Sequence, residues 1–212
     1  MDELDLLKKD WKKENQNYTQ VSETDIYKML HKNSSSTVKW ILIIGIIEFM
    51  VWTGIGFFFN TDEYIKSIHA EEMMVYVESL TYINYVVVLF FIYKFYQNYV
   101  KISTTSSTKQ LMKDILRTRK TVNYYVWYNL GMIVVSMVLG FIMGLLYNPK
   151  LTAVKDKIAN DASNGILVKI ICILTLATII FVFLFWLFYK LLYGILLRRL
   201  KSNYKVLENS EI

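Results

Sequence analysis

The sequence has few of the residues that build disulfides, metal centres or breaks in helices. Its 212 residues include one cysteine (Cys172), one proline (Pro149) and two histidines. A single cysteine excludes an intramolecular disulfide and a thiolate metal cluster. No P-loop, glycine-rich dinucleotide fingerprint or His-Glu-x-x-His motif occurs either. These absences exclude the commonest nucleotide-binding and metalloprotease sites.

Hydrophobic residues are abundant, at 54% of the chain, and they gather in continuous blocks. A membrane-spanning helix needs about 20 apolar residues, because the hydrocarbon core is about 30 Å thick. The runs are continuous rather than alternating, which favours helices over the strands of a membrane barrel. The sequence therefore predicts an all-α membrane protein with four transmembrane helices, at residues 38–59, 80–96, 124–147 and 170–189.

The arrangement of lysine and arginine predicts the orientation. Basic residues are frequent before the first span, between the second and third spans, and in the tail. The loop between the first two spans has Lys66 among several acidic residues. By the positive-inside rule, both termini and the central loop are expected in the cytoplasm. The net charge of +6 is therefore a topology signal with some attraction to membrane lipid, and it does not predict nucleic-acid binding.

The N-terminal segment, residues 1–37, contains two amphipathic stretches, and we predict that it is a cytoplasmic arm. Ser22 and Asp25 have capping-box spacing at the start of the second stretch. The serines at 34–36 are expected to end that helix just before the membrane. Apolar residues at helical spacing form the predicted contact face, which consists of Leu4, Leu7, Trp11, Ile26, Tyr27, Met29 and Leu30.

Two interpretations of this arm stay open. In one, the arm lies on the inner membrane surface with its lysines toward lipid phosphates. In the other, residues 2–33 dock into a groove of a soluble cytoplasmic protein. Acidic residues such as Asp5, Asp10 and Glu14 favour the second interpretation, because a helix that binds only lipid does not need them.

The central segment repeats this scheme over residues 106–121, where we predict a further amphipathic helix on the inner membrane surface. Ser107 and Gln110 can cap it, and its apolar stripe consists of Leu111, Met112 and Ile115.

Glu48 is an ionisable residue within the apolar run "VKWILIIGIIEFMVWTGIGFFF". Gly45, Glu48, Trp52 and Gly56 are spaced by three, four and four residues and so share one helix face. A carboxylate in a membrane is costly, so this face should point into the bundle.

The third span has a similar face of small and polar residues, within which "GFIMG" is a small-xxx-small pattern that permits close helix approach. We predict that the first span packs against this face, and that Lys94 in the second span can reach Glu48 as a counter-ion. The face consists of Asn129, Ser136, Gly140 and Gly144.

Glu48 also has two interpretations. As a structural group, it pairs with Lys94 or Asn129, or is protonated, and holds helices together. As a functional group, it resembles the single essential glutamate in the first span of the small multidrug antiporters, which also have four spans and aromatic residues beside that glutamate. Trp52 is similarly placed here, although this chain is longer and has large soluble loops.

Enzymatic sites are not indicated. His31 and His69 are expected on opposite sides of the membrane, so they cannot join in the histidine cluster of a membrane oxygenase. His69 and Glu72 could share a metal by spacing, but we interpret this loop as a solvated acidic segment. We predict no enzyme, no metal and no cofactor.

The stretches "LDLLKKDWKKE" and "SETDIYKMLHKNSSSTVKWILIIGIIEF" resemble a family of uncharacterised four-span inner-membrane proteins of flavobacteria and their relatives. The similarity covers about the first fifty residues. Among them are Trp11, His31, Trp40 and Glu48. The resemblance implies a multi-pass protein of the bacterial inner membrane, and an association with alternative sigma factors implies an anti-sigma-like role.

The predicted organisation is thus an arm (1–37), a four-helix transmembrane bundle (38–197) and a cytoplasmic tail (198–212). The predicted function is non-enzymatic: the arm tethers or regulates a soluble cytoplasmic partner. The alternative is a small proton-coupled exporter that uses Glu48. A homo-oligomer is compatible with either function.

Overall fold

The computed structural model describes residues 22–59, 61–161 and 165–210, and within these ranges the chain is helical and has no strand. The predicted all-α class is confirmed, and four helices are long and apolar enough to cross a membrane, as expected of a multi-pass membrane protein. The elements are α2 (Glu23–Phe58), α3 (Thr61–Ser67), α4 (Glu71–Thr104), α5 (Thr108–Tyr147), a 3-10 turn η1 (Pro149–Leu151), α6 (Thr152–Ala159) and α7 (Gly165–Ser210).

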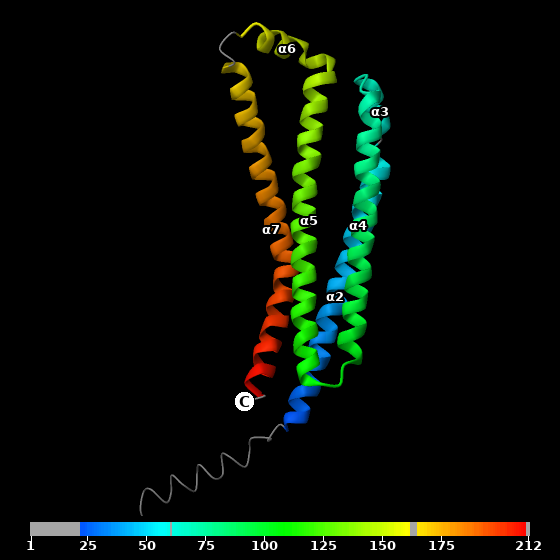
Figure 1. Cartoon of the computed structure of the whole chain (residues 1–212), viewed down its shortest axis with the longest axis vertical. Helices are drawn as coiled ribbons and strands as arrows, with labels where there is room; N and C mark the ends of the chain where they lie inside the picture. The colour runs from blue at the N-terminus through cyan, green and yellow to red at the C-terminus, as the bar shows by residue number, and fades with distance from the viewer. Residues whose placement is uncertain (1–21, 60, 162–164, 211–212) are drawn as a thin grey trace, which may run out of the picture.

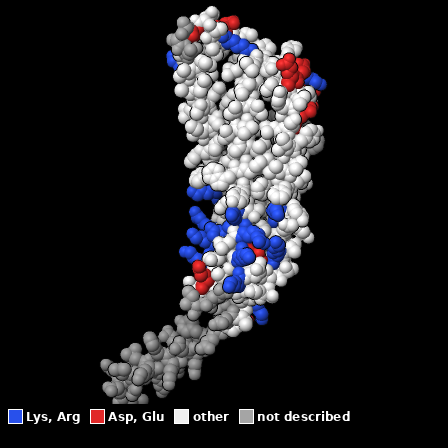
Figure 2. All heavy atoms as spheres, viewed as in Figure 1, with Lys and Arg blue, Asp and Glu red and all other residues white. Residues whose placement is uncertain are grey.

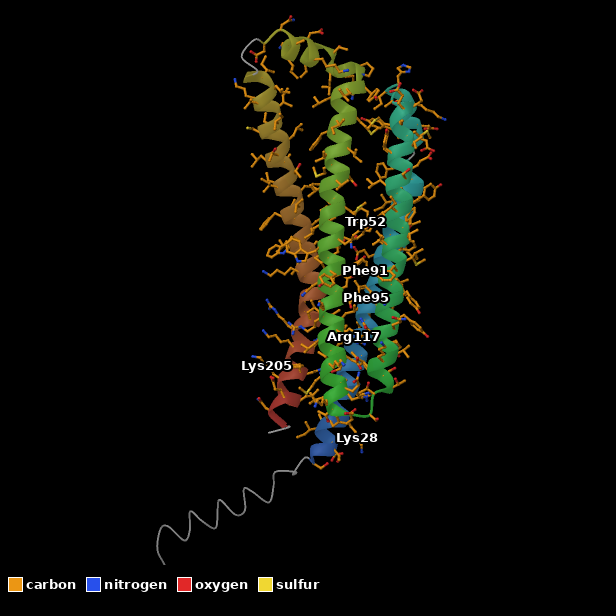
Figure 3. All side chains as sticks on the ribbon, viewed as in Figure 1. Lys28, Trp52, Phe91, Phe95, Arg117 and Lys205 are labelled. Atoms are coloured by element: carbon orange, nitrogen blue, oxygen red, sulfur yellow. The ribbon has the colours of Figure 1, made fainter. Side chains whose placement is uncertain are left out.

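The four long helices form an elongated bundle (Figure 1). α2 lies along α4 and α7, and α5 lies along the same two helices, so α2 and α5 are diagonal to each other. The start of α2, the α4–α5 turn and the end of α7 share one end of the bundle, whereas α3 and α6 lie at the other. We call these the basic end, where Lys28, Arg117 and Lys205 lie (Figure 3), and the loop end.

The expected packing of the first span against the third is therefore wrong. The short turn at residues 105–107 places α5 beside α4, and α7 fills the remaining side next to α2. α2 and α5 touch only briefly across the bundle.

α2 begins as predicted but does not end where predicted. Ser22 is its N-cap: its hydroxyl accepts a hydrogen bond from the Asp25 N–H (3.1 Å) and donates one to the Asp25 carboxylate (2.7 Å). The serine run does not break the helix, which continues to Phe58. Instead, Ser34 is fully buried and accepts a hydrogen bond from the Asn203 side chain (3.0 Å), so a small polar residue lets α7 approach closely.

The predicted surface helix at 106–121 is also corrected. This segment is the first part of α5, which runs unbroken from Thr108 to Tyr147. Leu111 and Ile115 are fully buried in the bundle core rather than available to lipid, and Met112 packs against that core. Ser107 precedes the helix but makes no side-chain cap. The tail likewise continues α7, with Leu207 buried.

The bundle has two unequal halves. Most fully buried side chains lie toward the basic end, within residues 22–48, 95–125 and 189–210, which we call the packed half. In the rest, the open half, many apolar side chains are exposed: Ile173 is 66% and Leu176 59% exposed. Figure 2 shows a band without charged residues across this face, between the basic end and the charged loop end. Exposed apolar surface of this extent is typical of lipid-facing helices.

The bundle is longer than a bilayer is thick. α7 has 46 residues, which at a rise of 1.5 Å per residue span about 69 Å, more than twice the hydrocarbon thickness of about 30 Å. Its uncharged stretch, Ile170–Tyr189, accounts for that thickness. The packed half, which we call the stalk, contains the part of α7 that continues beyond this uncharged stretch.

Candidate functional site

Glu48 is the most distinctive polar group in the bundle. It lies on α2, is only 7% exposed, and binds two tyrosines of α7. Tyr189 donates its hydroxyl hydrogen to one carboxylate oxygen (2.5 Å) and Tyr193 donates to the other (3.0 Å). Both oxygens are thus hydrogen-bonded, which is the condition for burying such a group at tolerable cost.

Aromatic rings from the other helices surround this group. Tyr125 of α5 packs edge-on against Tyr189 and Tyr193, at centroid distances of 6.4 and 6.0 Å. Phe95 of α4 packs edge-on against Tyr125 at 5.4 Å. These edge-to-face contacts are favourable for aromatic rings. We call Glu48, Phe95, Tyr125, Tyr189 and Tyr193 the Glu48 layer; it joins all four long helices.

Gly45 makes this layer possible. A Cβ atom added there would lie 3.2 Å from the Phe95 ring and so would require the ring to shift. The inward orientation expected of Gly45 and Glu48 is therefore confirmed. The other half of the predicted face differs: Trp52 is 47% exposed and Gly56 is exposed, although the Trp52 ring still contacts Phe185 of α7 (5.9 Å).

The hydrogen-bond partners of Glu48 show which part of α7 it lies beside. Tyr189 and Tyr193 lie on either side of Lys190, the residue that ends the uncharged stretch of α7. Glu48 is consequently within about one helical turn of that boundary. Before Glu48, the apolar run buries Val38 and Ile41 fully against the other helices, whereas Trp40 is 55% exposed.

Lys94 does not serve as the expected counter-ion. Its ammonium group lies 3.5 Å from the Gln97 side-chain oxygen and 5.3 Å from the Phe90 ring centre, both on its own helix. Among the residues that the structure describes, Glu48 forms no ion pair. Phe95, the residue after Lys94 on α4, points into the bundle, so Lys94 is turned away from the interior.

The residues of the predicted face of the third span have different surroundings and do not form one packing face. Asn129 donates to the Tyr125 carbonyl oxygen (2.8 Å) and not to Glu48. Ser136 lines a cavity described below. A Cβ atom added to Gly140 or Gly144 would meet nothing within 4 Å, so the "GFIMG" pattern does not form a close helix contact.

The arm residues also differ in their surroundings. Tyr27 and Leu30 pack against the bundle core, and the Tyr27 hydroxyl donates to the Thr105 carbonyl oxygen in the α4–α5 turn (3.1 Å). Burial raises the pKa of Tyr27 above its ordinary value. Met29 is 67% exposed and Ile26 is partly exposed. The remaining residues of the predicted face, Leu4, Leu7 and Trp11, lie outside the described residues.

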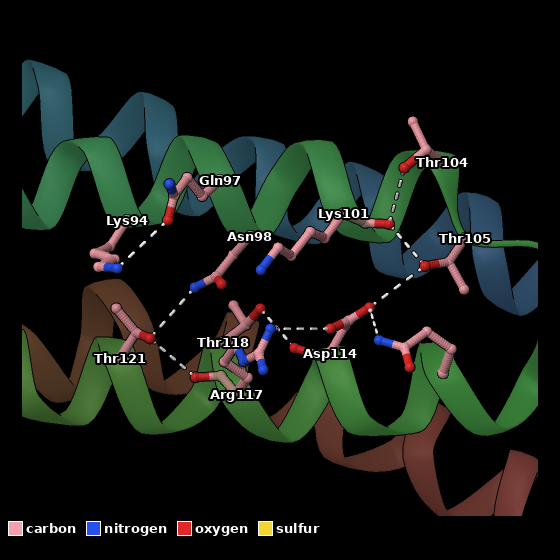
Figure 4. A network of polar contacts seen from close by, with 11 residues as sticks. Lys94, Gln97, Asn98, Lys101, Thr104, Thr105, Asp114, Arg117, Thr118 and Thr121 are labelled. Atoms are coloured by element: carbon pink, nitrogen blue, oxygen red, sulfur yellow. Dashed lines mark hydrogen bonds and ion pairs between the residues drawn. The ribbon is translucent and has the colours of Figure 1, made fainter.

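A second polar cluster lies at the basic end and was not anticipated. Asp114 is 2% exposed; it accepts a hydrogen bond from Gln110 (3.0 Å) and one from Thr105 (3.4 Å), and pairs with Arg117 (3.7 Å) (Figure 4). Nearby, Asn98 donates to Thr121 (3.3 Å). This cluster fastens α4 to α5 beside their connecting turn and has an evident structural role.

A cavity of about 360 Å³ adjoins the Glu48 layer on the side of the open half. Tyr125 and Tyr189 belong to both the layer and the cavity wall. The wall is completed by side chains from all four long helices: Phe49, Trp52, Thr53, Asn84, Tyr85, Val88, Asn129, Met132, Ile133, Ser136, Met137, Phe181 and Phe185. The cavity thus combines aromatic rings with a few neutral polar groups.

Sequence reasoning identified Glu48 but missed its partners. Tyr189 and Tyr193 are four residues apart, so they share a helix face, and this spacing was an available signal. Tyrosine is common at membrane interfaces, however, and nothing in one sequence distinguishes an interfacial tyrosine from an inward one.

The described residues contain no group of three potential metal ligands among His, Cys, Asp and Glu.

A family model described as a domain of unknown function (DUF8845) matches residues 24–212. No curated protein and no solved structure matches. The matched range includes all four long helices and the Glu48 layer, and it begins after Leu4, Leu7 and Trp11. The chain belongs to the DUF8845 family.

Proposed function

We propose that this member of the DUF8845 family is a non-enzymatic membrane protein that holds or regulates a soluble cytoplasmic protein through its N-terminal arm, residues 2–33. The observation that carries the proposal is the continuity of α2, which runs from Glu23 through the serine run to Phe58. A partner bound to the arm would be attached to a rigid helix that reaches the Glu48 layer, rather than to a flexible linker.

The packing of α2 narrows the proposed contact face. Tyr27 and Leu30 are already used by the bundle, so they position the helix. Met29 and Ile26, which belong to the arm, have apolar surface that the bundle leaves exposed. The proposed partner face therefore consists of Leu4, Leu7, Trp11, Ile26 and Met29. Apolar anchors at helical spacing are the usual form of a helix-in-groove contact.

The proposed location is a bacterial inner membrane with the stalk in the cytoplasm. Lysine and arginine are concentrated at the basic end (Figure 2), and the positive-inside rule assigns that end to the cytoplasm. The bacterial source and an anti-sigma-like role follow from the resemblance over the first fifty residues. Under this proposal the partner is a sigma factor or a similar soluble regulator.

The test is mild crosslinking in native membranes followed by purification and mass spectrometry. The structure argues for deleting residues 2–21 rather than 2–33, because the shorter deletion keeps the Ser22 cap and the Tyr27–Thr105 hydrogen bond. A soluble protein should copurify with the full chain and be lost from the deleted one. Identical partner profiles would overturn the proposal.

Point variants sharpen this test. Leu7→Ala combined with Trp11→Ala, and separately Met29→Ala, should each release the partner. Leu116→Ala is the matched control, because Leu116 is an apolar residue of the basic end that is 44% exposed and lies on α5 rather than on α2. Release by the control variant as strongly as by the arm variants would count against the arm as the contact face.

A second candidate function is proton-coupled export of a cation by means of Glu48. The observation that favours it is the buried carboxylate beside an aromatic cavity. The test is cation flux into proteoliposomes under a pH gradient, which Glu48→Gln should abolish. Absence of flux in the unaltered protein would remove this candidate and leave the arm proposal intact.

A further inference from the structure

We propose that the cavity beside the Glu48 layer binds a compact organic cation of the quaternary ammonium class. The inference deepens the export candidate by naming a substrate class, but binding itself requires neither transport nor a soluble partner.

The first argument is the chemistry of the wall. Aromatic residues reach the cavity from each of the four long helices: Phe49 and Trp52 from α2, Tyr85 from α4, Tyr125 from α5, and Phe185 and Tyr189 from α7. The rings meet in pairs, Trp52 with Phe185 at 5.9 Å and Phe49 with Tyr85 at 5.9 Å. A ring face carries partial negative charge, and aromatic cages are the usual way in which proteins recognise quaternary ammonium groups.

The second argument is the sign of the surrounding charge. Tyr189 lines the cavity and also donates to Glu48, so the carboxylate lies directly behind the wall. None of the lining residues is a lysine, arginine or histidine. Lys94 turns toward Gln97, and Lys190 lies over the Trp186 ring at 4.4 Å. Trp186 does not line this cavity. This arrangement disfavours anions.

The third argument is an unpaired polar atom. The Thr53 hydroxyl oxygen is buried and has no hydrogen-bond partner among the described residues, although buried hydroxyls are nearly always paired. Thr53 lines the cavity; because a quaternary nitrogen has no N–H, this oxygen can meet only the polarised C–H groups beside that nitrogen. The Asn84 oxygen, by contrast, is occupied by the Tyr128 hydroxyl (3.2 Å).

The fourth argument is size. A volume of about 360 Å³ is at the small end of the range of ligand sites. It suits a compact cation and not a large multi-ring compound.

The probe for the test is radiolabelled tetraethylammonium, bound at equilibrium to the purified full-length protein in maltoside micelles, where no choline headgroups compete. We expect saturable binding to one site per chain. The uncharged analogue 3,3-diethylpentane should not displace the probe, because it lacks the positive charge that the ring faces attract.

Variants locate the site. Trp52→Ala should weaken binding about tenfold or more, whereas Trp52→Phe should restore most of it. Trp186→Ala is the matched control, since it removes a tryptophan outside the cavity and should leave binding unchanged. Size-exclusion profiles of all three variants establish that they remain folded.

Several results would overturn the proposal: no saturable binding, equal binding by Trp52→Ala, or displacement by 3,3-diethylpentane. The last would identify the cavity as apolar without selectivity for charge. Saturable binding without cation flux in proteoliposomes would keep the site and remove the export function. Flux that persists in Trp52→Ala would overturn the site while keeping export.

Discussion

The hydrogen bonds of the Glu48 layer should be measurable as stability. We predict that replacing the hydroxyl of Tyr193 or of Tyr189 by hydrogen, in Tyr193→Phe and Tyr189→Phe, destabilises the bundle. Each change removes one of the two bonds to the Glu48 carboxylate, at 3.0 and 2.5 Å respectively, and leaves the aromatic packing in place. The bonds are therefore tested separately from the rings.

The expected magnitude depends on the surroundings. A hydrogen bond contributes about 0.5–1.5 kcal/mol net between neutral groups, and about 1.5–3 kcal/mol when one group is charged. Side-chain hydrogen bonds between membrane helices average about 0.6 kcal/mol and reach about 1.7. Because Glu48 is only 7% exposed, water cannot replace the lost donor. We therefore expect a loss of about 1–2 kcal/mol for each variant.

The assay is reversible unfolding in mixed micelles with increasing denaturing detergent, followed by circular dichroism. Tyr82→Phe is the control, because Tyr82 is 67% exposed on α4; it should change the free energy of unfolding by less than about 0.5 kcal/mol. In a Glu48→Ala background, Tyr193→Phe should cost little, which gives a coupling energy of about 1 kcal/mol. Equal costs of Tyr193→Phe in both backgrounds would refute the reasoning, since the hydroxyl would then stabilise the protein without Glu48.

Three further predictions concern packing and the basic end. Gly45→Ala should destabilise the bundle by about 1–3 kcal/mol in the same assay, because the new methyl would lie 3.2 Å from the phenylalanine ring of α4; Gly140→Ala, where nothing lies within 4 Å, should not. Asn203→Ala should cost about 1–3 kcal/mol because it leaves a buried serine of α2 without its donor; an unchanged unfolding curve would contradict this role. Burial raises the pKa of Tyr27, so its contribution is fully present below the unfolded value near 10 and is lost as pH rises through the folded value; the stability difference from Tyr27→Phe should therefore shrink above pH 10, and a difference independent of pH would contradict it.

The four long apolar helices and the start of α2 could be predicted from sequence because each depends on local chemistry. Lys169 and Lys190 bracket an uncharged stretch that must be helical in lipid. Ser22 and Asp25 satisfy each other within one turn, so their spacing alone predicts the cap. Neither inference needs knowledge of distant residues.

The stalk could not be predicted, because its pattern has two physical solutions. An apolar stripe beside lysines, as at Leu111 and Ile115, fits a helix on a membrane surface and fits equally a helix whose stripe faces three others in water. The structure takes the second solution, with both residues fully buried. The serine run misled for a similar reason: serine ends helices in isolation, but Ser34 finds its partner in Asn203, 169 positions away.

Glu48 lies where the packed half of the bundle meets the open half. Its apolar run is predicted to be a span with a carboxylate near the middle. In the structure, Val38 and Ile41 before Glu48 are fully buried in the core of the stalk, although Trp40 and Ile47 are exposed, and the run after Glu48 belongs to the open half. The layer therefore lies at the junction between the packed half and the open half. Burying the carboxylate there costs less than burying it without partners, because two tyrosine hydroxyls replace water. Because those hydroxyls belong to α7, sliding α2 along α7 must break both bonds together. Glu48 thus fixes the register between the helix that carries the arm and the helix that walls the cavity.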